Sequence, residues 1–161
     1  MREINRFYLE IKNIDELKKV NLENNEIEVK LIKTIDFNLN KFFYKQIGKN
    51  HRWTDRLSWN DNIWVNYINN KSVNTFVLTY NKNLAGYFER IYNKQNNEFE
   101  IAYFGILHEY RNKKFGAYLL SKAIELSFKD GAKRVWVHTC TFDHKNAIKN
   151  YLARGMKIFK E

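Results

Sequence analysis

The chain has 161 residues, of which 44% are hydrophobic and 16% aromatic, and it carries a formal net charge of +10. This length and apolar content predict one folded domain, residues 1–161, and exclude a disordered chain. No apolar run approaches the about 20 residues of a membrane-spanning helix, and the first residues lack a secretion signal. The single cysteine, Cys140, excludes an intrachain disulfide. We therefore predict a cytoplasmic protein without membrane partners.

The basic charge raises the question of a nucleic-acid partner. Lysine and arginine total 28 against 18 acidic residues, but the sequence contains no long basic block and no regular basic–aromatic ladder. The lysine excess accompanies many asparagines and isoleucines and no proline, which is typical of A/T-rich coding. We therefore predict no nucleic-acid partner, and keep a basic nucleic-acid-associated protein as an alternative.

The first half of the chain predicts two strands followed by two helices. Apolar periodicity predicts strands at Phe7–Ile11 and Ile27–Ile35, and helices over Asn40–Ile47 and from Asn60 or Asp61. Asp36 or Asn38 is the expected cap of the first helix. The first of these strands lies in an N-terminal extension, residues 1–26.

A segment dense in functional residue types, Gly48–Trp59, separates the two predicted helices. We predict a recognition loop there, because binding residues concentrate on loops held by a rigid scaffold. The substrate-binding candidates are His51, Arg52, Trp53 and Arg56, together with Tyr87 on a later strand. The alternative is that the tryptophans anchor the loop to the core while the charged side chains are solvated.

The second half predicts a three-strand meander, a helix, and a strand–helix–strand ending. The expected strands are Thr75–Tyr80, Leu84–Ile91, Glu100–Leu107, Arg134–Thr139 and Met156–Lys160. One expected helix begins after Gly116 and ends near Gly131, and a second spans Lys145–Ala153. These elements indicate an α+β fold with one mixed, mainly antiparallel sheet flanked by helices.

The loop before the helix that follows Gly116 resembles a phosphate-binding motif. Arg111-Asn112-Lys113-Lys114-Phe115-Gly116 is similar to the Q/R-x-x-G-x-G/A signature of the GNAT (Gcn5-related) N-acetyltransferases, with Lys114 in place of the usual glycine. A helix N-terminus with unpaired N–H groups and neighbouring cations is a suitable site for a pyrophosphate.

A second motif strengthens the resemblance. Ala147, Tyr151 and Gly155 keep the register of the family's N-x-x-A-x-x-x-Y-x-x-x-G-F segment, while His144 replaces the asparagine and Met156 the phenylalanine. The resemblance covers residues 27–161. It implies the GNAT acyl-CoA N-acyltransferase fold, with a V-shaped splay between the fourth and fifth core strands.

The resemblance also implies acetyl-CoA as the acyl donor. Backbone groups around Ile106 and Leu107 would hold the pantetheine arm, and the loop would hold the pyrophosphate. The cofactor-binding candidates are Ile106, Leu107, Arg111, Asn112, Lys113, Lys114, Phe115, Gly116, Ala117, His144 and Asn146.

The implied reaction is direct attack of a primary amine, on a small metabolite or a peptide, with no metal. Tyr151 matches the family's thiol-protonating tyrosine. Glu100 lies six residues before Ile106, the spacing of the base in histone-type members, and even spacing predicts that both side chains share one face. Glu89 on the neighbouring strand is the competing base, and either glutamate could be a solvated sheet charge.

Two further points stay open at this stage. The chain ends at Glu161, where many GNAT members add a strand, so we expect the N-terminal strand, as an added edge strand, or a partner subunit in a homodimer to cover that edge. A CoA-binding module without catalysis is an alternative to an enzyme, because Lys114 and His144 depart from the family's motifs.

Overall fold

A computed structural model describes residues 5–140, 143 and 146–161. Its strands form one sheet of seven, in the order β2-β3-β4-β5-β6-β1-β7. The strands are β1 (Arg6–Ile11), β2 (Ile27–Leu31), β3 (Val73–Tyr80), β4 (Asn83–Asn93), β5 (Glu98–Ile106), β6 (Arg134–Cys140) and β7 (Lys157–Lys160). The α-helices are α1 (Phe37–Gly48), α2 (Asp61–Asn69), α3 (Phe115–Lys129) and α4 (Ala147–Ala153). Of the described strand pairs only β5 and β6 are parallel, which confirms the mixed α+β sheet.

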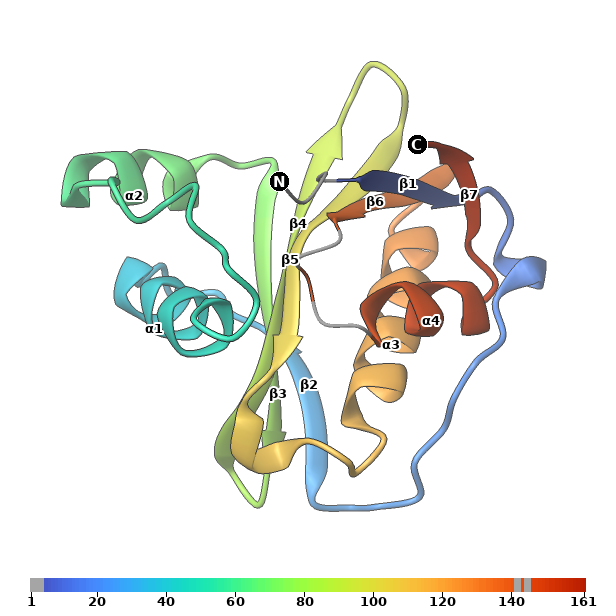
Figure 1. The fold of residues 1–161 in the computed structure, drawn as a ribbon, viewed down its shortest axis with the longest axis horizontal. Coiled ribbons are helices and arrows are strands. Elements are labelled where there is room, and N and C mark those ends of the chain that lie inside the picture. Colours follow the sequence, from blue (N-terminus) through green and yellow to red (C-terminus); the bar gives the residue numbers. More distant parts are fainter. Residues whose placement is uncertain (1–4, 141–142, 144–145) are drawn as a thin grey trace.

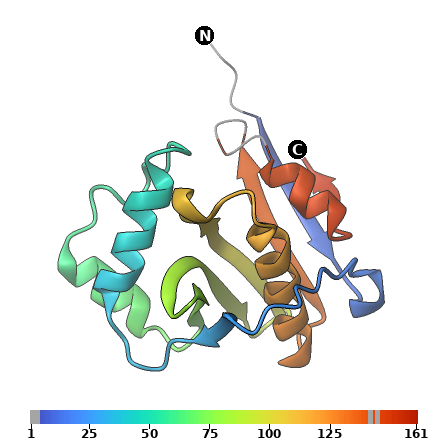
Figure 2. The ribbon, with the colours of Figure 1, turned by 90° about the horizontal axis from the view of Figure 1, so that it is seen from below.

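The helices cover the two faces of the sheet in pairs. Figure 1 shows α1 and α2 on one side of the sheet and α3 and α4 on the other, and Figure 2 shows the same layers from below. The larger core lies against α3 and includes Leu119 and Ile124, and a smaller core forms around Phe43, Ile47 and Tyr87. The site-forming loops therefore project from a sheet that is packed on both sides.

Side-chain caps begin the first two helices where the sequence predicts them. The Asp36 carboxylate accepts from the Asn38 N–H at 2.9 Å, and the Asn60 side chain accepts from the Ile63 N–H at 2.9 Å. The strand predicted over Ile27–Ile35 is shorter in the structure, because β2 stops pairing with β3 at Leu31. The chain then turns toward the cap of α1.

The two parallel strands separate along their length. β5 and β6 pair only from Glu98 to Ile101, opposite Arg134–Val137. Within the described chain, the rest of β5 pairs with β4 alone. This separation is the V-shaped splay that the family resemblance implied, and it leaves one edge of β5 with unpaired backbone groups.

A β-bulge changes which way the side chains of β5 point. Glu89 pairs with Tyr103 and Arg90 with Ile101, so Ala102 is an extra residue in β5. Ile106 lies in the core against α3, whereas Glu100 faces the opposite side of the sheet. The prediction that these two side chains share a face is therefore wrong.

The N-terminal strand occupies an inner position. β1 pairs antiparallel with β6 on one side and with β7 on the other, so it covers the edge of β6 while β7 forms the edge of the sheet. Gly155 closes α4 with φ +101, and a Cβ there would lie 2.1 Å from the Glu16 carbonyl oxygen. Only glycine fits this contact between the N-terminal segment and the end of α4.

A buried ion pair connects the α1–α2 layer to the sheet. Glu89 of β4 is fully buried and accepts hydrogen bonds from Arg56 Nη1 at 3.0 Å, Asn40 Nδ2 at 2.9 Å and Tyr67 Oη at 2.6 Å. The Arg56 guanidinium lies 4.1 Å from the centroid of the Tyr103 ring and 4.3 Å from that of Tyr67. Burial lowers the pKa of Arg56, but the Glu89 carboxylate and the surrounding tyrosines together exceed this effect and raise it.

We predict that Glu89→Gln lowers the free energy of unfolding by about 3–5 kcal/mol, because it leaves the Arg56 charge buried without its partner. Urea denaturation measures this. Glu28→Gln, at an exposed position of β2, is the matched control and should change stability by about 0.5 kcal/mol or less. The double variant Arg56→Met/Glu89→Gln should lose less than the sum of the single variants, and strict additivity would contradict the account.

Candidate active site

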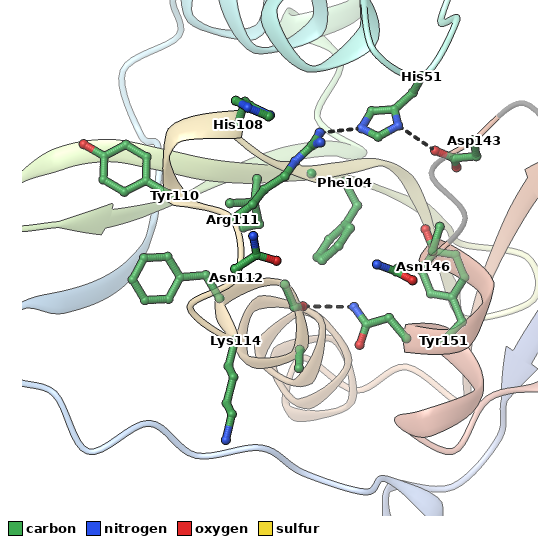
Figure 3. Close-up of a pocket in the computed structure, with 17 residues that line it drawn as sticks. His51, Phe104, His108, Tyr110, Arg111, Asn112, Lys114, Asp143, Asn146 and Tyr151 are labelled. Atoms are coloured by element: carbon green, nitrogen blue, oxygen red, sulfur yellow. Dashed lines mark hydrogen bonds and ion pairs between the residues drawn. The ribbon is translucent and has the colours of Figure 1, made fainter.

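A cavity of about 700 Å³ lies between the second half of β5, the start of α3, and α4. Figure 3 shows its lining side chains, which come from β5, α3 and α4, from the loops that follow β5 and β6, and from the α1–α2 loop. The predicted site residues that line it are His51, Ile106, Arg111, Asn112, Lys114, Phe115, Gly116, Ala117, Asn146 and Tyr151. Three segments distant in the sequence thus meet around one space.

The start of α3 is built to present backbone N–H groups. Lys114 takes the left-handed conformation (φ 66, ψ 14) at the N-cap, with no side-chain cap. The first hydrogen bond of the helix runs from the Tyr118 N–H to the Lys114 carbonyl, so the N–H groups of the first turn have no partner within the helix. The left-handed backbone explains why a glycine suits position 114, and Lys114 adopts it at a steric cost of about 1–2 kcal/mol. Its side chain points away from Arg111 and His51 (Figure 3).

A chain of polar contacts crosses one end of the cavity. Arg111 Nη2 lies 2.8 Å from His51 Nε2, and His51 Nδ1 lies 3.7 Å from an Asp143 carboxylate oxygen (Figure 3). The other oxygen of Asp143 accepts from the Thr139 hydroxyl at 2.9 Å. Because a guanidinium only donates, His51 Nε2 is the acceptor and the proton of the neutral ring sits on Nδ1, facing Asp143. Arg111, predicted to contact a pyrophosphate, contacts His51 in this structure.

Tyr151 of α4 lines the same cavity and is 5% exposed. Burial, aided by the Asp143 carboxylate, raises the pKa of Tyr151 far above its usual range, so the hydroxyl keeps its proton at neutral pH. The neighbouring Asn150, which the motif did not single out, donates to the Gly116 carbonyl at 3.1 Å. This hydrogen bond ties α4 to the start of α3.

Several predicted substrate-binding residues lie away from this cavity. Tyr87 is fully buried and stacks on Phe43 with ring centroids 4.6 Å apart. Trp53 packs its ring edge-to-face on Tyr103, with centroids 4.8 Å apart, and Arg52 is exposed. The Trp53 contact supports the alternative in which the tryptophans anchor the loop to the core, but its other half is wrong for Arg56, which is buried against Glu89 and not solvated.

The remaining predicted cofactor residues have different surroundings. Leu107 is buried in the smaller core and donates its N–H to the Ala85 carbonyl at 2.8 Å. The Lys113 ammonium lies 5.9 Å from the centroid of the Tyr80 ring, outside the cavity lining. His144 lies outside the described residues.

The two candidate bases have opposite environments. Glu89 is buried and saturated with hydrogen bonds, which argues against a role in accepting a substrate proton. The Glu100 side chain is 24% exposed, and Oε1 lies 3.7 Å from His138 Nε2. Burial raises the pKa of Glu100, while His138 and Arg56 oppose the rise. Glu100 borders a second cavity, of about 320 Å³, that shares no lining residue with the first.

Two negative observations hold for the described part of the chain. It contains no group of three or more histidine, cysteine, aspartate or glutamate side chains arranged to hold a metal ion. None of its helices combines the length and the apolar character needed to cross a bilayer.

Comparison with solved structures identifies the fold. The chain is similar to a GCN5-related N-acetyltransferase from Sphaerobacter thermophilus, with a TM-score of 0.71 and 12% identity; the match covers 95% of this chain and 48% of that one. It is also similar to a GCN5-related N-acetyltransferase from Kribbella flavida, with a TM-score of 0.65 and 14% identity; the match covers 96% of this chain and 56% of that one. It thus spans about half the length of these two relatives. It is also similar to an aminoglycoside acetyltransferase from an uncultured soil metagenomic sample, with a TM-score of 0.67 and 11% identity; the match covers 81% of this chain and 88% of that one.

No curated protein matches the sequence. Residues 37–156 match the acetyltransferase (GNAT) family, and this segment contains the cavity, the α3 loop and Tyr151. The chain therefore belongs to the GNAT acetyltransferase family.

Proposed function

We propose that this protein is an N-acetyltransferase that uses acetyl-CoA to acetylate a primary amine. One observation carries the proposal. The unpaired edge of β5, the uncapped start of α3 and the protonated Tyr151 border a single cavity of about 700 Å³. An extended amide chain, a pyrophosphate and a leaving thiolate need those three features.

The residues present fit the acyl donor. Backbone groups of β5 up to Ile106 would bind the pantetheine arm as an added strand binds, and the first-turn N–H groups of α3 would bind the pyrophosphate. Lys113 and Lys114 add positive charge to that loop, and Asn146 lines the opposite wall. Acetyl-CoA supplies an acetyl group activated as a thioester.

The protein's own residues would move two protons. Glu100 would accept the proton that the attacking amine loses, directly or through one water, and its raised pKa brings it closer to neutral pH, where a base works best. Tyr151 would donate its phenol proton to the leaving sulfur. Its raised pKa keeps the phenol protonated at neutral pH and also makes it a weaker acid. The acceptor would be a small molecule or a peptide amine.

A CoA-binding module without catalysis is the second candidate. It is favoured by Arg111, which contacts His51, and by Lys114, which stands where the family has glycine. Both features lie in the proposed phosphate-binding loop. They therefore predict a change in the affinity for acetyl-CoA more directly than a loss of catalysis.

Thermal unfolding with and without acetyl-CoA tests the proposal. At about 100 times the Kd, binding adds about 2.7 kcal/mol, which raises Tm by roughly 5–10 °C for a domain of this size. Adenosine diphosphate is the control for phosphate binding alone and should give a smaller rise. No rise with acetyl-CoA would contradict both candidates, whereas a rise without thiol release on any amine would leave the binding module.

We predict that Tyr151→Phe lowers kcat about 100-fold or more, because it removes the proton donor and keeps the ring. The rise in Tm with acetyl-CoA should stay the same. Thiol release measures the rate, and Tyr118→Phe, on α3 and outside the cavity lining, is the matched control. Undiminished turnover in Tyr151→Phe would remove the acid assignment.

We predict that Glu100→Gln lowers kcat by about 10²–10⁴-fold at unchanged acetyl-CoA binding. In the wild type, kcat should fall as the pH is lowered through the pKa of Glu100, and because burial raises that pKa the fall begins at a higher pH than for an exposed glutamate. This limb of the pH profile should disappear in the variant. Glu28→Gln is the control, and a fully active Glu100→Gln would assign the base elsewhere.

A further inference from the structure

One face of β6 and β1 carries aromatic side chains and no helix. Val135 and Val137 of β6 lie in the core against α3, so Trp136 and His138 face the other way. The same alternation on β1 buries Leu9 and turns Tyr8 outward. Figure 1 shows α1 and α2 beside β3–β5 and away from β1 and β6, so no helix of the described chain covers this face.

The side chains on this face form a continuous group of rings. Tyr8 lies with its ring centroid 6.4 Å from Trp136, 5.8 Å from His138 and 6.2 Å from Phe159 of β7. His138 is 46% exposed and Phe159 42% exposed. We call Tyr8, Trp136, His138 and Phe159 the aromatic shelf. Tyr8 and Trp136 are half-buried, and the Arg134 guanidinium lies 4.6 Å from the centroid of the Phe159 ring and 5.8 Å from that of Trp136. The parts of the rings that stay exposed can contact flat apolar groups.

A carboxylate suited to an amine stands at the inner end of the aromatic shelf. Glu100 is the cross-strand neighbour of Trp136, and its ion pair is with His138 at 3.7 Å. The two other glutamates of this face, Glu10 and Glu98, both accept hydrogen bonds from Arg134. Glu100 is thus the carboxylate that an incoming ammonium would meet.

The aromatic shelf borders the place where the strands separate. The last paired residues are Ile101 and Val137, and His138 is the next residue of β6. The cavity of about 320 Å³ extends from Glu100 and Trp136 to the β4–β5 turn. Of the aromatic shelf only Trp136 lines this cavity, while Tyr8, His138 and Phe159 lie outside its lining. The space beside Glu100 has the volume of a small molecule.

We propose that the aromatic shelf binds the acceptor, and that the acceptor is a small primary amine whose nitrogen is attached to a flat apolar ring by a short linker. The inference rests on the proposed N-acetyltransferase function. The ring lies on Trp136 and Tyr8 while the nitrogen reaches Glu100. The ammonium first releases one proton to solvent, and Glu100 takes the one proton that the neutral amine loses as it attacks the thioester carbon. The nitrogen forms the amide bond as the carbon–sulfur bond breaks, and the sulfur leaves with the Tyr151 proton.

The test compares two amines that differ in the ring, 2-phenylethylamine and butylamine. Calorimetry measures the Kd of each without acetyl-CoA, and thiol release with acetyl-CoA measures each KM. For the wild type we expect 2-phenylethylamine to have a Kd and KM about tenfold lower. Trp136→Leu should raise both values for 2-phenylethylamine about three- to tenfold and change those for butylamine less than twofold.

Two further variants keep the test decisive. Phe159→Leu, on the exposed edge strand, should raise the values for 2-phenylethylamine selectively even if Trp136→Leu fails to fold. Phe42→Leu changes an equally exposed ring on α1 and should alter neither amine.

The outcomes separate this inference from the proposed function. Binding of 2-phenylethylamine that depends on Trp136, without thiol release, supports the aromatic shelf and contradicts the enzyme. Thiol release that is equal for the two amines, or that falls equally for both in Trp136→Leu, supports the enzyme and overturns the aromatic shelf. Failure of 2-phenylethylamine to bind also overturns it.

Discussion

The separation of β5 from β6 after Ile101 is the feature on which the site depends. Backbone N–H and carbonyl groups need partners, so a strand edge that ends its pairing inside a domain is a place for an extended ligand. The loops that follow the two diverging strands carry the start of α3 and the start of α4 to opposite sides of one cavity. The aromatic shelf borders the same separation from the other face of the sheet. Both proposed substrates thus approach one gap in the pairing.

Two glutamates on adjacent strands show how surroundings decide the role of a side chain. Glu89 has an arginine, an amide and a phenol around it, so its charge is satisfied and holds α1, α2 and the intervening loop on the sheet. Glu100 is partly exposed and lies 3.7 Å from a histidine nitrogen, so it is accessible from outside the core. Both are glutamates within strands of the meander, and their packing distinguishes them.

The sequence predicted the order of the elements and the family, because periodicity and two spaced motifs are local properties. It extended β2 to Ile35, since alternation continues after pairing with β3 has ended. It placed Glu100 on the wrong face, because one extra residue, Ala102, reverses the alternation of β5 and leaves no mark in the residue pattern. The contact between His51 and Arg111 joins residues 60 positions apart, which spacing alone does not predict. In Gly48–Trp59 it predicted a recognition loop, but Arg56 is buried and Trp53 packs on Tyr103.

The inner position of β1 has a consequence for folding. Leu9 pairs with Val137, so β2 to β5 lie between β1 and its partner β6 in the sequence, and within the described chain β7 pairs with β1 alone. Such non-local pairing raises the contact order and slows folding. The meander of β3, β4 and β5 joins neighbouring segments and is free to form earlier, so the half of the sheet that carries the aromatic shelf is completed last.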